Sequence, residues 1–246
     1  MKKSIITIGA PLVLSHLATA SVLVSDNFDY TDGSLVPNGG WANHSGTVGD
    51  LLVAGGQAVV QHGTPSEDAN LAFTPTAGKL YYGFDFSVGD LGAPYSGVDN
   101  EYFAHFKDDA FAFRARMDIL EPSAGGDFSV GISSDSSTAE GVWATDLTYD
   151  TFYRAIVEYD QVAGVAKMWI NAALETDTSV SGAVGSADAM TQFALRQSDS
   201  SENETITVDG LVVGTAFSDV VNPVPEPSSF ALLGLAGLAA MLRRRN

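Results

Sequence analysis

The fold class is decided by one stretch, Lys79–Val88 (KLYYGFDFSV), in which every second residue from Leu80 onward is large and apolar. A period of two places such side chains on one face of a β-strand. The same alternation recurs in 111–119, 128–132 and 153–160. It predicts antiparallel strands with one face toward a core and the other mostly toward solvent.

Weaker strand patterns flank these four segments. They cover residues 22–28, 51–54, 57–62, 69–74, 101–107, 164–171, 192–197 and 204–213. Residues 160–164 are expected to form a tight hairpin, and 183–190 one helical turn. About ten to twelve strands without crossover helices indicate a sandwich or a barrel. Long strands bracketed by a first and a last strand favour an all-β, two-sheet jelly-roll sandwich.

Segment 111–119 carries two arginines in an acidic chain. Its alternation predicts Phe113 and Met117 in the core, with Arg114 and Arg116 on the opposite face. The arginines either pair with carboxylates on neighbouring strands or meet an anionic or hydroxyl-rich ligand on an open face.

Composition excludes several classes of function. The 246 residues include 12 Lys and Arg against 30 Asp and Glu, so the formal charge is −18. Such a chain repels a phosphate backbone, which argues against a nucleic-acid partner. The absence of cysteine excludes disulfides, thiol nucleophiles and cysteine-based metal sites.

The first 20 residues have the pattern of a secretory signal peptide and predict a signal helix read by the secretion machinery. Lys2 and Lys3 precede a mostly apolar run, 5–17, and Ala18-Thr19-Ala20 provides a small-x-small cleavage site before Ser21. The alternative is an uncleaved anchor, but the run is shorter than the ~20 residues that a membrane span needs.

The C-terminus combines three unlike parts. Val224-Pro225-Glu226-Pro227 is followed by 13 residues without a polar side chain, 230–242, and then by Arg243-Arg244-Arg245. The apolar run predicts a hydrophobic helix about 20 Å long, which would cross a thinned inner membrane with its arginines on the cytoplasmic side. The alternative is a plain C-terminal anchor.

This tail resembles the PEP-CTERM sorting signal of Gram-negative bacteria that produce exopolysaccharide. The resemblance implies recognition by a membrane exosortase, which cleaves near the Pro-Glu-Pro and releases or re-anchors the protein outside. The protein is then expected to be anchored at the membrane through its C-terminal helix before sorting, and afterwards to lie in the cell envelope or extracellular matrix. Removal of both ends would leave seven basic and 29 acidic residues, a charge of about −22.

The region between the ends resembles the concanavalin A-like, or laminin-G-like, domains of secreted PEP-CTERM proteins. The resemblance covers about residues 22–220 and is carried by segments at 26–41, 159–171, 193–197 and 206–214. It implies a β-sandwich rather than an activity. The expected domains are a signal peptide, the sandwich, a Pro-rich linker, and the helix with its arginines. Their ranges are 1–20, 21–220, 221–229 and 230–246.

No catalytic motif is complete. β-Glucanases of this fold carry Glu-x-Asp-x-x-Glu on one strand. Glu158-Tyr159-Asp160 supplies the first half, but residue 163 is alanine. The preferred interpretation is that Glu158 and Asp160 form the solvent-facing end of a strand, and that the protein is not an enzyme.

The mature region has three histidines, His44, His62 and His105, outside any hydrolase or zinc-protease motif. We expect surface or half-buried side chains, with a zinc site as the alternative. His105 is expected on the face opposite Tyr102 and Phe106.

Two kinds of binding residue remain candidates. Calcium is a candidate cofactor because it prefers the oxygen ligands of loop acids. These acids are Asp90, Asp99, Asp108, Asp109, Asp135, Asp146 and Asp150. Trp41, Tyr95 and Trp143 lie in loop-like contexts and are candidate glycan contacts, because sugar rings stack on exposed aromatics. The alternative is that these side chains cap the core, and Trp169 is expected to pack within a strand.

Three classes of function follow from this sequence. The first is a non-catalytic surface or matrix protein held in exopolysaccharide. The second is a lectin-like module that binds extracellular polysaccharide, with or without calcium. The third is a polysaccharide hydrolase or lyase, which the missing carboxylate disfavours.

Overall fold

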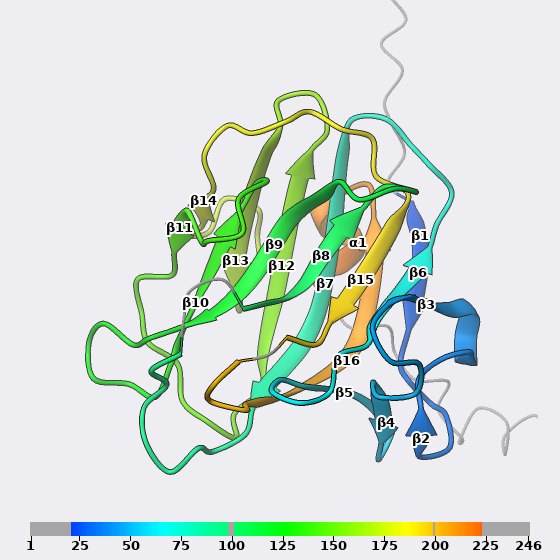
Figure 1. Cartoon of the computed structure of the whole chain (residues 1–246). Coiled ribbons are helices and arrows are strands. Elements are labelled where there is room, and N and C mark those ends of the chain that lie inside the picture. Colours follow the sequence, from blue (N-terminus) through cyan, green and yellow to red (C-terminus); the bar gives the residue numbers. More distant parts are fainter. Residues whose placement is uncertain (1–20, 98–100, 199, 223–246) are drawn as a thin grey trace, which may run out of the picture.

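A computed structural model describes residues 21–97, 101–198 and 200–222. Two antiparallel sheets pack face to face (Figure 1). The nine-stranded sheet runs in the order β14 (Val180–Ser181), β13 (Val165–Ile170), β12 (Tyr153–Asp160), β7 (Lys79–Val88), β16 (Thr205–Gly214), β5 (Gln57–Gln61), β4 (Leu52–Ala54) and β2 (Gly33–Ser34), with β1 (Val22–Asp26) paired to β16. The seven-stranded sheet runs β11 (Gly141–Val142), β10 (Ser129–Ser133), β9 (Phe113–Leu120), β8 (Tyr102–Lys107), β15 (Gln192–Arg196), β6 (Asp68–Ala72) and β3 (Trp41–Ser45).

The all-β sandwich predicted from the sequence is therefore confirmed. Strands β7 and β12 have the predicted bounds, and the Gly164 N–H donates to the Asp160 carbonyl to close the predicted hairpin (2.8 Å). The helical turn expected at 183–190 is wrong, because this segment contains no helix. The described helices are a 3₁₀ turn, η1 (Asn38–Gly40), and the short α1 (Phe217–Val220).

The predicted signal peptide, 1–20, and the predicted sorting tail from Val224 onward lie outside the described residues. Within 21–97, 101–198 and 200–222, no helix has the length and apolar character needed to cross a membrane.

An aromatic layer fills the space between the sheets. Tyr82 and Phe84 of β7 contact Phe106 of β8 and Phe193 of β15, and the Tyr82 ring centroid lies 5.0 and 5.1 Å from theirs. Edge-to-face pairs of this kind contribute about 0.5–1.5 kcal/mol each beyond the area they bury. The period-two pattern of β7 thus supplies one wall of the core.

Strand β9 departs from the predicted alternation. Ala115 has φ = 53°, in the left-handed region, and the Tyr82 hydroxyl donates to the Ala115 carbonyl across the core (2.8 Å). The break puts Phe113 opposite Lys107 and outside the core, whereas Met117 stays inside. The prediction that Phe113 faces inward is therefore wrong, and so is the outward placement of Arg114, which lies opposite the core residue Phe106 and pairs with Asp188.

Strand β8 is irregular as well. Its pairing with β9 shifts register on both sides of Ala104. Phe103, Ala104 and Phe106 belong to the core, while Tyr102 and His105 contact one another outside it, with ring centroids 5.2 Å apart. The expectation that His105 and Tyr102 lie on opposite faces is wrong for this reason.

The outer side of the nine-stranded sheet is closed by α1 (Figure 1). Phe217 and Val220 of this helix join a second apolar cluster, in which the Phe217 ring lies 5.3 Å from Trp169. Arg154 donates to the carbonyls of Val220 (2.8 Å) and Gly210 (2.9 Å), so a buried guanidinium fixes the end of the helix.

The two ends of the described chain meet beside α1. The Ser21 backbone nitrogen donates to Asp219 Oδ2 (3.0 Å) and to Thr215 Oγ1 (3.1 Å). The same Asp219 oxygen accepts the N–H groups of Thr215 and Ala216. The predicted first residue of the mature protein is thus held at the end of the sandwich.

Because the alternation of β9 breaks at Ala115, we predict that alanine substitutions of Met117 and Phe113 lower the free energy of unfolding by different amounts. Met117→Ala should cost about 2–5 kcal/mol because it opens a cavity in the core. Phe113→Ala should cost about 1 kcal/mol because that ring is only partly buried. Urea denaturation of both variants measures the difference, and a larger loss for Phe113→Ala would contradict the placement of the two side chains.

The contact between Ser21 and Asp219 predicts that the thermal stability of the domain depends on cleavage before Ser21. Cleavage before Ser21 would turn its nitrogen into an ammonium group beside a carboxylate, and partly exposed pairs of this kind are worth about 0.2–1 kcal/mol. Asp219→Asn should therefore lower the melting temperature more in protein that begins at Ser21 than in protein whose Ser21 amine is acetylated. Equal losses in both forms would exclude the ion pair.

Candidate functional site

The outer side of the seven-stranded sheet collects aromatic and charged side chains from five of its strands. In antiparallel pairs, residues directly opposite one another share a face. The pairing places Arg196 opposite Asp68, Tyr102 opposite Asp118, and Lys107 opposite Phe113. We call this surface the cationic face. It comprises His44, Asp68, Tyr102, His105, Lys107, Phe113, Arg116, Asp118 and Arg196.

Two guanidinium groups lie over one tyrosine ring at the centre of this face. Cζ of Arg196 is 4.3 Å and Cζ of Arg116 is 4.8 Å from the centroid of Tyr102, and Arg116 also lies 5.7 Å from the Phe113 centroid. Cation–π contacts contribute about 0.5–2 kcal/mol, more when solvent is excluded. The rings therefore help to hold both cations in place.

His105 lies beneath this pair and is 1% exposed. Its ring is flanked by Tyr102 (5.2 Å) and Phe113 (4.9 Å). Neither ring nitrogen has a hydrogen-bond partner in the part of the chain that is described. Burial, reinforced by Arg116 and Arg196, holds the pKa of His105 well below its usual value, so the imidazole is neutral.

An aromatic row continues from the cationic face to solvent. His44 of β3 lies 5.5 Å from both Phe111 and Phe113, and Phe111 is 76% exposed. Phe111 precedes β9, so the loop before this strand carries the row beyond the edge of the sheet. An exposed ring next to fixed polar groups can stack against the apolar face of a ligand ring.

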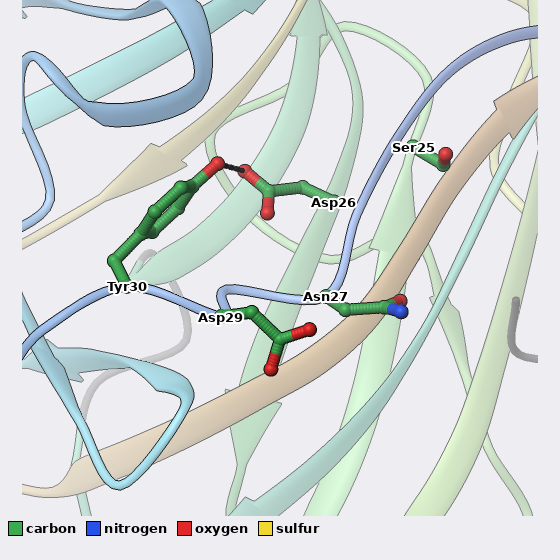
Figure 2. A pocket seen from close by; sticks show the side chains of 5 residues that line it. All are labelled: Ser25, Asp26, Asn27, Asp29 and Tyr30. Atoms are coloured by element: carbon green, nitrogen blue, oxygen red, sulfur yellow. Dashed lines mark hydrogen bonds between the residues drawn. The ribbon is translucent and has the colours of Figure 1, made fainter. Parts of the chain in front are cut away.

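Trp41 does not provide an exposed platform. It is buried, and its Nε1 donates to Asp26 Oδ2 (2.7 Å), which also accepts the Tyr30 hydroxyl (2.9 Å). Figure 2 shows Asp26 and Tyr30 pointing toward one another in a hollow of about 240 Å³ that Asn27 and Asp29 also line. Asp26 therefore anchors the tryptophan in the core.

The other two candidate aromatics lie away from the cationic face. Tyr95 is buried, and its hydroxyl lies 3.5 Å from Glu204 Oε1, so it lacks the exposure that sugar stacking needs. Trp143 is half-buried and borders an open hollow of about 520 Å³ together with Asn171 and Asp177. The structure therefore does not bring the three predicted glycan contacts together.

Glu158 is not solvent-facing, which corrects the sequence-based expectation. It is buried and accepts hydrogen bonds from the Tyr81 hydroxyl (2.6 Å) and Lys79 Nζ (2.9 Å). Asp160 does lie at the hairpin, where it accepts the N–H groups of Val162 and Ala163. Both carboxylates therefore have structural partners on the nine-stranded sheet.

The candidate calcium ligands also serve the turns. Asp146 accepts N–H groups from Ser123, Ala124 and Gly126, which lower its pKa, and Asp135 accepts the N–H of Ser186. Asp99 lies outside the described residues. No group of three or more His, Asp or Glu side chains that could hold a metal ion is found in the described ranges.

The histidines differ from the expected surface positions, since His62 and His105 are buried and only His44 is half-exposed. His62 Nδ1 lies 2.7 Å from Glu204 Oε1, and Ser200 donates to the other carboxylate oxygen (2.7 Å). Because the serine contacts the carboxylate rather than the imidazole, this buried group is not a nucleophile–base pair.

The sequence reading identified Arg116 but missed Arg196, Tyr102 and Phe111 as parts of one site. The available signal was the presence of two arginines on one strand of an acidic domain. Arg196 lies on the same face as Arg116 only because β15 pairs with β6 and β8, and these strands are far apart in the sequence.

Comparison with known families identifies the tail. Residues 223–245 match the PEP-CTERM protein-sorting motif. The chain carries an exosortase sorting signal. The motif implies export and anchoring at a membrane before cleavage, as the sequence predicted. No curated protein matches the chain in sequence.

Solved structures resemble the sandwich. A basic winged bean lectin with Tn-antigen matches with a TM-score of 0.50 and 9% identity, covering 80% of this chain and 98% of the lectin. A sialidase matches with a TM-score of 0.52 and 10% identity, covering 81% of this chain and 19% of the sialidase. A peanut lectin gives a TM-score of 0.49 and 12% identity over 80% of this chain and 98% of its own. At these identities the likeness shows the fold alone, and the winged bean lectin and the sialidase support the predicted concanavalin A-like β-sandwich.

We predict that the contribution of the buried Glu204 to the free energy of unfolding is lost in acid. Burial opposes its ionisation, but the hydrogen bonds from His62 and Ser200 outweigh this effect and lower its pKa. Because the pKa of Glu204 is lower in the folded protein, the ionised side chain stabilises the fold at pH values above about 4.3, the pKa of glutamate in an unfolded chain. This stabilisation is lost as the pH falls through the pKa of the folded state. Glu204→Gln should therefore cost about 1–3 kcal/mol at pH 7 and much less at pH 3. Denaturation at both pH values measures this, and an equal cost at each would contradict the assignment.

Proposed function

We propose that this chain is an exported, non-catalytic surface or matrix protein whose sandwich binds extracellular polysaccharide through the cationic face. The observation that carries the proposal is the aromatic row that ends at the exposed Phe111 beside the two guanidinium groups. The sorting motif supports an exported location, because it implies export and anchoring at a membrane before cleavage.

The chemistry of the face suits a sugar. A pyranose presents an apolar C–H surface to an aromatic ring and hydroxyl groups to polar side chains at its edge. Phe111 and Phe113 offer the aromatic surface, while Arg116 and Arg196 offer donors. The lectin-like fold is consistent with this proposal, although many unrelated functions use one fold.

Binding without turnover is proposed for two reasons. Glu158 is committed to Tyr81 and Lys79, and alanine occupies position 163, where the glucanase motif has its third carboxylate. The candidate carboxylate pair therefore lies in a structural role on the sheet opposite the cationic face.

The test is binding of the mature exported protein to the polysaccharide of its own host. Phe111→Ser should weaken binding by about 1 kcal/mol, roughly fivefold, because it removes an exposed stacking surface. Phe152→Ser is the matched control, since Phe152 is 50% exposed and lies before β12 of the other sheet. Absence of binding by the parent protein would refute the glycan-binding role, and release of shorter saccharides would refute the non-catalytic role.

A further inference from the structure

We propose that the cationic face selects acidic sugars, with Arg116 and Arg196 binding the carboxylate of a uronic acid residue. This inference rests on the proposed function, because it names the class of glycan that the same face takes.

The four arginines of the described chain divide into two pairs. Arg114 pairs with Asp188, and Arg154 lies 3.5 Å from Asp85 while donating to two buried carbonyls. By contrast, Arg116 and Arg196 form no salt bridge with any described carboxylate. Two half-buried cations outside the salt bridges of the domain are unexpected where there are about four acidic residues for each basic one.

The donors of these two groups are largely unused. A guanidinium carries five N–H donors in a planar fork that matches a carboxylate. Arg196 donates one hydrogen bond, from Nη1 to the Tyr102 carbonyl (3.2 Å). Arg116 donates none to the described protein, and its buried Nε is without a partner there. An oxyanion would satisfy these donors with charge-assisted hydrogen bonds.

His105 gives a second, independent indication. Buried polar groups without partners are rare in native proteins, and each one needs a physical reason. The His105 imidazole carries a donor and an acceptor, both unpaired within the described ranges, and it contacts the rings that hold Arg116. The surroundings of Arg116 therefore contain a second polar group without a hydrogen-bond partner in the described protein.

Two acids of the same face attract the pair electrostatically, since Asp68 acts on Arg196 and Asp118 acts on Arg116. Asp68 lies opposite Arg196, and its Oδ2 accepts the Ser45 hydroxyl. Burial raises the pKa of Asp68, while Ser45 and Arg196 oppose this effect. Asp118 lies opposite Tyr102. The remaining acids of the domain act at longer range, and at about 0.15 M salt charges more than ~8 Å apart are largely screened.

The aromatic row explains why a sugar acid fits better than a free carboxylate. Phe113 adjoins Arg116, and Phe111 adjoins Phe113, with 6.4 Å between the two ring centroids. A uronic acid residue can place its carboxylate on the guanidinium groups and the next pyranose ring on these phenylalanines. Acetate has no ring to place there.

Calorimetry of the mature protein with hexagalacturonate and with its methyl ester tests the inference. The two ligands share their rings, and each carboxylate of the acid is a neutral methyl ester in the other. At about 0.15 M salt, the acid should bind at least tenfold more tightly than the ester, and acetate at the same concentration should not displace it. This comparison uses the parent protein, so it does not depend on the folding of a variant.

Substitutions locate the effect. Arg116→Gln and Arg196→Gln should each weaken binding of hexagalacturonate about tenfold or more. Lys167→Gln is the matched control, because it removes one positive charge from a cation–π contact with Trp169 on the other sheet, and it should change binding less than twofold. Melting curves of all three variants should show the cooperative transition of the parent protein.

The outcomes separate this inference from the proposed function. Equal binding of acid and ester, no binding of the acid, displacement by acetate, or an equal effect of Lys167→Gln would each overturn selection of acidic sugars at this face. If the host polysaccharide still bound and Phe111→Ser still weakened that binding, the glycan-binding role would stand without it.

Discussion

One hydrogen bond across the core holds the arrangement on which the cationic face depends. The Tyr82 hydroxyl, fully buried in the nine-stranded sheet, donates to the carbonyl of Ala115 in the seven-stranded sheet. Ala115 is left-handed, so this contact pairs a carbonyl at the point where the alternation of β9 breaks. An unpaired carbonyl there would cost about 1–3 kcal/mol. The break turns Phe113 outward beside Arg116, and the aromatic and cationic groups consequently share one face.

The two sheets have different surroundings. The short helix α1 packs on part of the outer side of the nine-stranded sheet, and polar groups of that side, including Arg154 and Glu158, bond to other parts of the protein. The seven-stranded sheet carries partly exposed cations without salt bridges to described acids.

The sequence predicted the architecture because regular alternation in Lys79–Val88 and Tyr153–Asp160 is a local property. It could not predict the face of Phe113, because the break occurs at an alanine and is held by Tyr82, which is 33 residues away. Nor could it place Trp41, whose Gly-rich surroundings resemble an exposed loop while Asp26 anchors the indole in the core. The sorting motif was predictable in full, since the order of its three parts along the chain identifies it.

The central claim is that Arg116 and Arg196 are the ligand-binding cations of this protein. NMR spectra of the four arginine side chains between residues 21 and 222 test it directly, because each Nε–H gives its own signal. During titration with hexagalacturonate, the signals of Arg116 and Arg196 should shift together and saturate. Those of Arg114 and Arg154 should stay in place, because these side chains already have protein partners. Shifts confined to Arg114 or Arg154, or no shift in any of the four, would contradict the account.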